Sequence, residues 1–229
     1  AKQETNGIIN NIFNTIKFNQ SKKIIFNKDY NFNLKGSDFF YFEDEFGKIK
    51  LSKPNLPGQF QLENVSTAIA TARQLPDLKI TDQHIKSGIT KIESIARLQE
   101  IKSGKLKNLV KNNQLFIDGS HNPLGAKVLN EYLQSLNCRK HIILGMMANK
   151  DHNEYMSYFK NIESITTIDI PNQPNAIKGN KLKDKVEHIK NSNYQSSVEE
   201  AIKSINLKEK DIILITGSLY LAGEVLNLN

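Results

Sequence analysis

The segment that decides the fold lies near the end of the chain and is Asp211-Ile212-Ile213-Leu214-Ile215-Thr216-Gly217-Ser218-Leu219-Tyr220. Its run of four apolar residues, Ile212 to Ile215, is typical of a strand in the middle of a parallel sheet, which is covered on both faces. Gly217 permits a tight turn, and Ser218 lies where the following helix begins. A strand that turns directly into a helix is the repeating unit of an open α/β sheet.

The same alternation extends back along the chain to about residue 94. Short apolar strands alternate with amphipathic helices over short links, which predicts an open, doubly wound α/β domain with a mostly parallel sheet. The expected strands are 114–118, 141–145, 165–170 and 211–216. The expected helices are 124–136, 152–160, 180–189, 198–205 and 220–226.

The first part of the chain has a different, α+β pattern. The spacing of its apolar residues predicts helices at 4–17, 59–75 and 82–90, the last with Thr81 as its N-cap. Segments 23–26, 38–43 and 48–51 have the composition of short strands, and a turn around Gly47 joins the last two. With a boundary expected between residues 92 and 97, the predicted domains are 1–93 and 94–229.

Composition excludes several classes of protein. The 229 residues contain 31 Lys and Arg against 24 Asp and Glu, which gives a formal net charge of +7. No apolar run approaches the roughly 20 residues that cross a bilayer, and the first residues lack the apolar stretch of a signal peptide. A single cysteine, Cys138, favours a reducing compartment, so we expect a cytoplasmic protein. The first residue is not methionine, which suggests a piece of a longer chain.

The excess of positive charge does not by itself indicate a nucleic-acid partner. Arginine occurs only at Arg73, Arg97 and Arg139, and the lysines are scattered along the chain. A nucleic-acid site more often shows clustered arginine with interleaved aromatic residues. We therefore expect a solvated lysine-rich surface, which remains compatible with the attraction of small anionic molecules.

Two polar loops follow predicted strands. The first contains Asp118 and His121, and the second contains Ser218 and Tyr220. Ligands of open α/β sheets bind beyond the carboxyl ends of the strands, so both polar corners are expected to face one crevice. The helix that follows the second loop carries partial positive charge at its start, which stabilises a nearby anion by about 0.3–1 kcal/mol. This favours a small carboxylate as the ligand.

Each of these residues also has a structural interpretation. Asp, Ser and Asn at helix starts are mostly caps, and His121 could serve only as a turn residue. No metal site is expected, because the five histidines show no ligand spacing with each other or with Cys138. A catalytic triad of Ser120, His121 and Asp118 is not expected, because the three residues are too close in sequence and no nucleophile elbow is present. Neither a P-loop nor a G-x-G-x-x-G motif is present, so an autonomous NTPase or NAD enzyme is not supported.

Four sequence blocks carry a resemblance to a known family. Residues 56–65 (L-P-G-Q-F-Q-L-E-N-V) resemble L-x-G-x-H-Q-x-x-N-A, and residues 96–99 (A-R-L-Q) resemble G-R-[LM]-[EQ]. Residues 117–123 (I-D-G-S-H-N-P) are similar to D-G-A-H-N-P. Residues 215–225 (I-T-G-S-L-Y-L-A-G-E-V) are similar to a C-terminal T-G-S-L-Y-L motif. Residues 145–151 (G-M-M-A-N-K-D) also resemble G-x-x-x-D-K-D. Over nearly its whole length the chain therefore resembles folylpolyglutamate synthase/dihydrofolate synthase, of the Mur ligase superfamily.

This resemblance implies an ATP-dependent ligase that joins folate to L-glutamate through an acyl phosphate, with Mg²⁺ as the metal. It also implies a site by position. ATP contacts are assigned to Asn64 near the adenine, Arg97 near the phosphate, and Asp118. Contacts with the incoming glutamate are assigned to His121, as a catalytic residue, and to Ser218 and Tyr220 as substrate-binding residues. An arginine at the domain junction could span two phosphate oxygens; its alternative is a surface ion pair.

The sequence departs from the family pattern at single positions. Phe60 replaces a histidine, Ala96 a glycine, Ser120 an alanine and Asn149 an aspartate. Phe60 cannot donate a hydrogen bond and Asn149 lacks a charge, so the local contacts of these two residues are expected to differ from those of the family.

The resemblance also implies a missing part. The family's P-loop, magnesium ligands and modified lysine lie upstream of the aligned start, so residues 1–93 are expected to be a remnant of an N-terminal ATP-binding domain. Residues 94–229 are then a Rossmann-like glutamate-ligase domain. The expected partner is a P-loop half, from the same gene product or a separate chain, in a monomeric enzyme. The alternatives are a non-catalytic remnant that binds nucleotide or glutamate and, less favoured because of the T-G-S-L-Y ending, a cell-wall Mur ligase domain.

Overall fold

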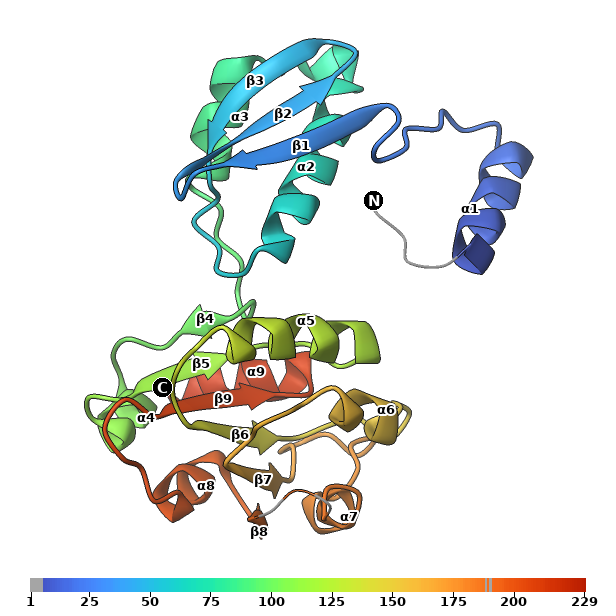
Figure 1. Cartoon of the computed structure of the whole chain (residues 1–229). Helices are drawn as coiled ribbons and strands as arrows, with labels where there is room; N and C mark the ends of the chain where they lie inside the picture. Colours follow the sequence, from blue (N-terminus) through green and yellow to red (C-terminus); the bar gives the residue numbers. More distant parts are fainter. Residues whose placement is uncertain (1–5, 188, 190) are drawn as a thin grey trace. The chain divides into compact units, whose positions relative to one another are not determined.

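The computed structural model describes residues 6–187, 189 and 191–229. The chain divides into two compact units, with the division between Glu93 and Ser94 (Figure 1). Each unit has a hydrophobic core of its own. None of the described helices is long and apolar enough to cross a membrane.

The first unit is a three-stranded antiparallel sheet with helices packed on one face. Its strands lie in the order β1-β2-β3. The core residues of α2 and α3 pack against the inward side chains of the sheet, of which Phe40 and Phe42 on the central strand are fully buried. The elements are α1 (Asn6–Phe18), β1 (Tyr30–Lys35), β2 (Phe39–Asp44), β3 (Gly47–Ser52), α2 (Phe60–Arg73), the 3₁₀ turn η1 (Pro76–Leu78) and α3 (Asp82–Ile89).

Helix α3 begins where the sequence predicts it. The Thr81 hydroxyl accepts the N–H of His84 at 3.2 Å, and the His84 ring accepts the N–H of Thr81 at 3.3 Å. These two bonds satisfy backbone donors that a helix start otherwise leaves unpaired. The predicted N-cap is therefore confirmed.

One strand prediction in the first unit is wrong. Segment 23–26 forms no strand, and only Phe26 makes an isolated bridge, to Tyr30. The chain turns there instead, because the Asp29 carboxylate accepts the N–H of Ile25 at 2.7 Å and Asn27 adopts a φ of 63°. The strand is β1, whose alternation of apolar and asparagine residues was an available period-two signal. Residues 4 and 5 of the predicted first helix lie outside the described residues.

The second unit is a six-stranded, mostly parallel sheet. The strand order is β4-β5-β9-β6-β7-β8, and only β4 is antiparallel to its neighbour. Its strands are β4 (Gln99–Glu100), β5 (Gln114–Ile117), β6 (Lys140–Leu144), β7 (Ser164–Ile168), β8 (Ser192–Gln195) and β9 (Ile212–Thr216). Its helices are α4 (Lys105–Val110), α5 (Pro123–Gln134), α6 (His152–Ser157), α7 (Gly179–Asp184), α8 (Val198–Ser204) and α9 (Leu219–Leu228).

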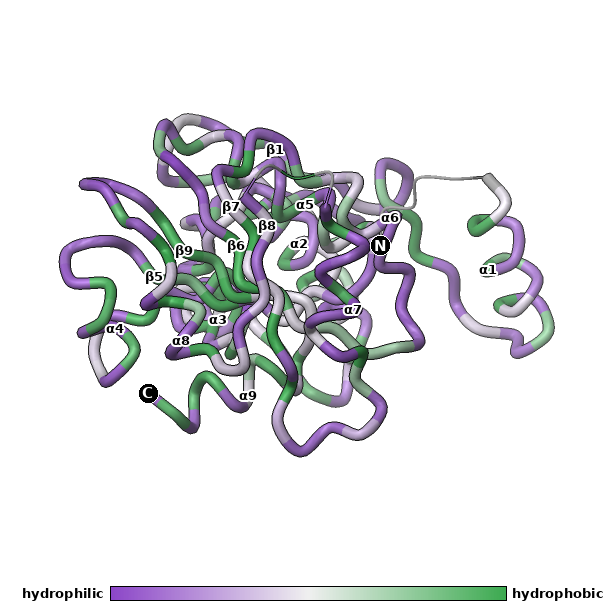
Figure 2. Tube along the Cα trace, turned by 90° about the horizontal axis from the view of Figure 1, so that it is seen from below, coloured by the Kyte–Doolittle hydropathy of each residue, from purple (hydrophilic) through white to green (hydrophobic). Residues whose placement is uncertain are grey.

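Helices cover both faces of this sheet, so the predicted doubly wound fold is confirmed. Leu115 and Ile117 of β5 share a core cluster with residues of α4, α8 and α9. Phe116, which points to the opposite face, packs edge-on against Tyr132 of α5. Every residue of β9 is buried, as expected of a central strand, and Figure 2 shows hydrophobic residues along β5, β6 and β9.

Three elements of the second unit were not predicted. Strand β4 has two residues, and the edge strand β8 has the polar sequence Ser-Asn-Tyr-Gln, so neither gives an apolar run. Helix α4 is also short. The predicted helix 180–189 ends at Asp184, and residue 188 lies outside the described residues. Short edge elements depend on pairing with the completed sheet more than on local pattern.

A buried ionic cluster joins the amino ends of the central strands. The side chains of His141 and Asp211 are 3% and 2% exposed, and His141 Nε2 donates to the Asp211 carboxylate at 3.2 Å. The Arg139 guanidinium pairs with the same carboxylate, and the hydroxyl of Ser164 lies 2.7 Å from His141 Nδ1. Burial raises the pKa of Asp211, but its bonds from Arg139, from the Lys208 N–H and from His141 outweigh burial and lower it overall.

Burial lowers the pKa of His141, and the bond to Asp211 offsets this only in part. Unfolded histidine, with a pKa of about 6.5, therefore takes up its proton at a higher pH than folded His141 does. The contribution of neutral His141 to the free energy of unfolding is complete above the pKa of histidine in the unfolded chain. It is lost as the pH falls from there toward the lower pKa of folded His141, by at most about 1.4 kcal/mol per pH unit.

We expect the free energy of unfolding at β6 and β9 to fall less steeply in a His141→Gln chain than in the wild type between about pH 7 and about pH 5. Urea titrations followed by the amide signals of these strands measure it. His84→Gln, a change in the other unit, should keep the wild-type slope at β6 and β9. Equal slopes for the wild type and His141→Gln would contradict the prediction.

Candidate functional site

Two polar corners lie side by side at the carboxyl edge of the parallel sheet. We call residues 118–122 the first corner and residues 216–220 the second corner; they follow β5 and β9, which are neighbours in the sheet. The N–H of Asp118 donates to the Ile215 carbonyl at 3.0 Å, and the N–H of Gly217 donates to the Ser120 carbonyl at 3.1 Å. The structure therefore brings together the two loops that the sequence singles out.

Asp118 ties the first corner to the segment that precedes β4. One carboxylate oxygen accepts the N–H of Ser120 at 2.7 Å, and the other accepts the N–H of Leu98 at 2.8 Å. Burial raises the pKa of the Asp118 carboxyl, and the two N–H bonds and the nearby Arg97 charge lower it only in part. Asp118 is 4% exposed, so its main visible role is to hold this loop in place.

Arg97 is presented outward by a strained loop. Its neighbours Ala96 and Leu98 are buried and have φ values of 54° and 47°, a left-handed conformation that non-glycine residues adopt rarely. The Arg97 side chain is exposed and makes no hydrogen bond or ion pair with any residue that the structure describes. Within that part of the chain, the surface ion pair considered as its alternative is not found, and the guanidinium is open to an anion.

His121 has one ring nitrogen engaged and one open. Nδ1 lies 3.0 Å from the Gly119 carbonyl oxygen, so the neutral ring carries its proton on Nδ1 and a lone pair on Nε2. Nε2 has no hydrogen-bond partner among the described residues. The helix cap is supplied by Asn122, whose side chain accepts the N–H of Gly125 at 2.9 Å. The half-buried imidazole of His121 is therefore not needed to cap α5.

In the second corner the sharp turn depends on Gly217. Its φ of 108° and the 2.6 Å distance from an added Cβ to the Gly145 carbonyl leave room for glycine alone. Ser218 caps α9, since its hydroxyl accepts the N–H of Tyr220 at 3.1 Å, and it is 2% exposed. Tyr220 is 55% exposed. The capping interpretation of Ser218 is thus correct, while the Tyr220 phenol is open to a ligand.

Asn64 belongs to the first unit, apart from the five other predicted site residues. It is exposed on α2, and its amide donates to the Gln61 side chain at 3.0 Å. The Phe60 ring, which stands in place of the family's histidine, folds back over Gly58, where an added Cβ would lie 2.3 Å from it. The departure at Phe60 is therefore accommodated by local packing.

Tyr155 is a residue of the site region that the sequence analysis did not single out. Its phenol is fully buried under the first corner and contacts the hydroxyls of Ser120 and Thr216. A tyrosine on an amphipathic helix carries no local signal of such a role. Only the packing of α6 against the sheet edge reveals it.

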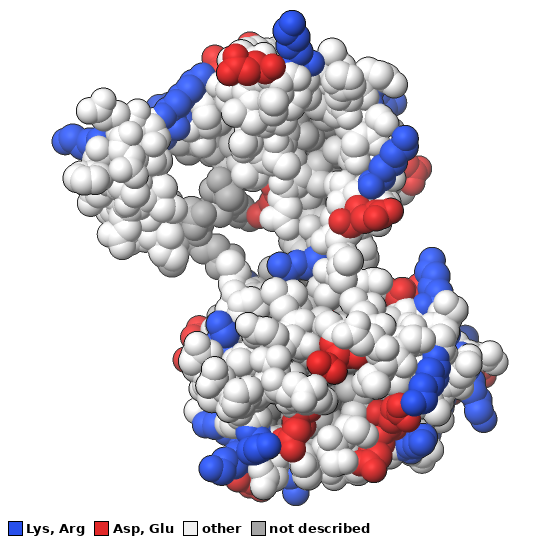
Figure 3. Space-filling model, turned by 180° about the vertical axis from the view of Figure 1, so that it is seen from behind, with Lys and Arg blue, Asp and Glu red and all other residues white. Residues whose placement is uncertain are grey.

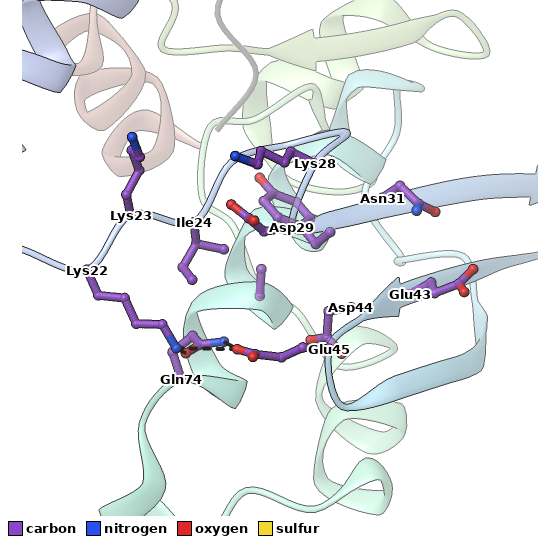
Figure 4. Close-up of a pocket in the computed structure, with 12 residues that line it drawn as sticks. Lys22, Lys23, Ile24, Lys28, Asp29, Asn31, Glu43, Asp44, Glu45 and Gln74 are labelled. Carbon is purple, nitrogen blue, oxygen red and sulfur yellow. Dashed lines mark hydrogen bonds and ion pairs between the residues drawn. The ribbon is translucent and has the colours of Figure 1, made fainter.

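No predicted site residue lines the pockets described in either unit. A pocket of about 440 Å³ in the first unit is bounded by segment 22–31, the end of β2 and α2 (Figure 4). Lys22 there already pairs with Glu45 at 3.3 Å and with Gln74. A pocket of about 370 Å³ in the second unit lies beside Arg139 and Glu163, which pair with each other. In the first of these pockets, however, the buried side-chain oxygens Asn31 Oδ1 and Asp44 Oδ2 have no hydrogen-bond partner among the described residues.

Charge and metal-ligand distribution give no further site. On the face seen in Figure 3, Lys and Arg side chains are interspersed with Asp and Glu on each unit. Among the described residues, no group of three or more His, Cys, Asp and Glu side chains could hold a metal ion.

Comparison with known proteins identifies the family. Residues 96–219 match the family described as Mur ligase, glutamate ligase domain. The chain belongs to this Mur ligase family. The matched stretch contains Arg97, the first corner and most of the second corner, whereas Asn64 and Tyr220 lie outside it.

Individual Mur ligase relatives point in the same direction. The folylpolyglutamate synthase of Lacticaseibacillus casei is 29% identical over 192 residues, which are 81% of this chain and 42% of the relative. The dihydrofolate synthase/folylpolyglutamate synthase of Bacillus subtilis is 26% identical over 213 residues, 88% of this chain and 46% of the relative. The chain thus spans less than half the length of these two relatives.

Solved structures show the same fold. The E. coli FolC complex with ADP has a TM-score of 0.78 at 22% identity, covering 94% of this chain and 50% of that one. Mycobacterium tuberculosis folylpolyglutamate synthase complexed with ADP has a TM-score of 0.84 at 16% identity, covering 99% of this chain and 53% of that one. The fold of this chain is therefore shared with proteins about twice as long.

Gly217→Ala should lower the free energy of unfolding by about 2–4 kcal/mol, because the alanine combines backbone strain with a clash against Gly145. Gly223→Ala is the matched control, since a Cβ there meets nothing within 4 Å and α9 gains up to about 1 kcal/mol. Urea denaturation measures both changes. Equal stabilities for the two variants would contradict the assigned turn geometry.

Proposed function

We propose that this Mur ligase chain is the C-terminal portion of an ATP-dependent ligase that adds L-glutamate to the carboxyl group of a folate. Two observations support the proposal: the activities for which the relatives are named, and the pairing of β5 with β9, which sets the polar corners side by side. The names of two relatives also include dihydrofolate synthase, so dihydropteroate is a second acceptor to test.

The proposed reaction proceeds in two steps. A folate carboxylate oxygen attacks the γ-phosphorus of ATP, which gives an acyl phosphate and ADP. The glutamate amine then attacks the acyl carbon, so that a C–N bond forms, the C–O bond to phosphate breaks, and the amine loses a proton. Positioning and electrostatic stabilisation dominate such phosphoryl transfer.

The open groups of the two corners and of Arg97, in the segment before β4, fit these steps. The Arg97 guanidinium can bind two phosphate oxygens at once, because its donors form a planar fork. Nε2 of His121 carries the lone pair that can accept the amine proton. The start of α9 and the Tyr220 hydroxyl bind a glutamate carboxylate, with Ser218 supporting them as the cap.

Asp118 and Asn64, two of the ATP contacts that the family resemblance implies, have different roles in this proposal. Asp118 acts on ATP through the segment that presents Arg97, because backbone N–H groups already occupy both of its carboxylate oxygens. Asn64 contacts the adenine from the first unit, which we assign to the ATP-binding domain. The described residues offer no cluster for Mg²⁺, so its ligands are assigned to the portion of the relatives that has no counterpart here.

The proposal also includes the compartment and the oligomeric state of the ligase. Cys138 is a free, half-buried thiol, which suits the cytoplasm, and the complete ligase acts as a monomer.

Mixing this chain with a separately expressed P-loop half should produce ADP that depends on both glutamate and a folate. Neither half alone should turn over, because the chain has no P-loop to position the phosphates. A coupled assay for ADP, with glutamate omitted as the control, measures it. Ligand binding without turnover in the mixture would favour the alternative, a non-catalytic binding module.

In the assembled ligase, Arg97→Ala should reduce kcat/KM for ATP by about 100-fold, as expected of a lost charge-assisted contact to phosphate. Tyr220→Phe should raise KM for glutamate by about tenfold and leave ATP use unchanged. Tyr220→Phe is a cleaner test than Ser218→Ala, which also removes the cap of α9.

Arg97→Lys is the matched control, since it keeps the charge and loses the fork, and its activity should lie between the wild type and Arg97→Ala. Effects on the opposite substrates, with Arg97 governing glutamate and Tyr220 governing ATP, would overturn the assignment.

A further inference from the structure

A closed group of three hydroxyls lies beneath the two corners. The Tyr155 hydroxyl is 2.9 Å from Ser120 Oγ and 3.0 Å from Thr216 Oγ1, and these two are 3.3 Å apart. Tyr155 comes from α6, Ser120 from the first corner and Thr216 from the end of β9. Three elements that are separate in sequence therefore meet at one phenol.

The same phenol reaches the backbone that joins the corners. Its hydroxyl lies 3.3 Å from the Ser120 carbonyl oxygen, which also accepts the N–H of Gly217 at 3.1 Å. Tyr155 is fully buried, and burial raises the pKa of its phenol, so the hydroxyl remains protonated and able to donate.

This arrangement is more polar than packing requires. A phenylalanine, an alanine and a valine would fill similar space without three buried hydroxyls, each of which must be hydrogen-bonded to be tolerated. The bonds are placed where they can act on the site: Ser120 directly precedes His121, and Thr216 lies two residues before Ser218. Small displacements of reacting groups, of about 1 Å, can slow an enzyme about 100-fold.

We propose that Tyr155 is a positioning residue, which fixes the first corner against the second through its hydroxyl and thereby aligns His121 with the start of α9. This inference rests on the proposed function only in naming the ligase reaction that the alignment serves. Tyr155 acts through Ser120 and Thr216. Ser120 stands where the resembled motif has alanine, so both contacts of its hydroxyl depart from that motif.

The test is Tyr155→Phe in the full chain, which keeps the ring packed against Phe159 and removes the hydroxyl alone. Amide hydrogen exchange of Gly217 and Ser120 should become about tenfold faster, which corresponds to one lost hydrogen bond. Exchange of Ile142 and Ile143 in β6 should stay at the wild-type rate. Tyr158→Phe is the matched control, because its hydroxyl has no hydrogen bond among the described residues.

Two exchange results would overturn the proposal: no change at the corners, or an equal acceleration at the corners and in β6, which would mean a general loss of stability. Ser120→Ala is the second variant, and it decides the question if Tyr155→Phe does not fold. It should accelerate exchange at Gly217 selectively, and an unchanged rate would contradict the role of the hydroxyl group.

In the assembled ligase, Tyr155→Phe should lower kcat by about tenfold and leave the KM values near those of the wild type, since no substrate-contacting group is removed. A change in KM alone would contradict a positioning role. If the assembled wild-type enzyme has no ligase activity, the proposed function fails, whereas the exchange data still decide whether Tyr155 positions the corners.

Discussion

Parallel pairing of β5 with β9 is the interaction on which the candidate site depends. The register sets Ile117 opposite Ile215, so the two strands end together and their loops leave the sheet at the same level. Strand β9 lies between β5 and β6, and all its residues are buried, which gives the sheet edge a rigid base. Cross-links in both directions between the loops, through the N–H groups of Asp118 and Gly217, then make the corners one structural unit.

The polar residues of this unit divide into those that the fold uses and those that it leaves open. The side-chain oxygens of Asp118, Asn122 and Ser218 accept hydrogen bonds from backbone N–H groups at loops and helix starts. Such donors are otherwise unpaired, and leaving them buried without partners is unfavourable by about 1–3 kcal/mol each. Among the described residues of the corners and the adjoining segment, Arg97, Nε2 of His121 and the Tyr220 phenol remain available for a ligand. Few groups at this sheet edge are therefore free to contact a ligand, and most of the polar side chains hold the loops in place.

The first unit relates to the site differently. Its core between a small antiparallel sheet and two helices is complete in itself, and the Arg73 guanidinium is held by Asp44 and Asp82. Relatives and structural neighbours of about twice the length match this chain over most of its residues, which include parts of both units. Each of the two units has its own hydrophobic core, as is typical of separate domains.

The sequence by itself determined the strand–helix alternation, the doubly wound class and the two polar corners, because buried apolar runs, glycine turns and helix caps are local signals. It also showed Asn122 and Ser218 as candidates for caps, and Thr81 as the start of α3. Tertiary structure alone decided that β4 and β8 complete the sheet edges, since such pairing depends on distant partners. It alone decided that Asp118 serves the loop, that Arg97 has no described partner, and that Tyr155 lies beneath the corners. These properties arise from burial and from contacts between residues far apart in the chain, which no local pattern records.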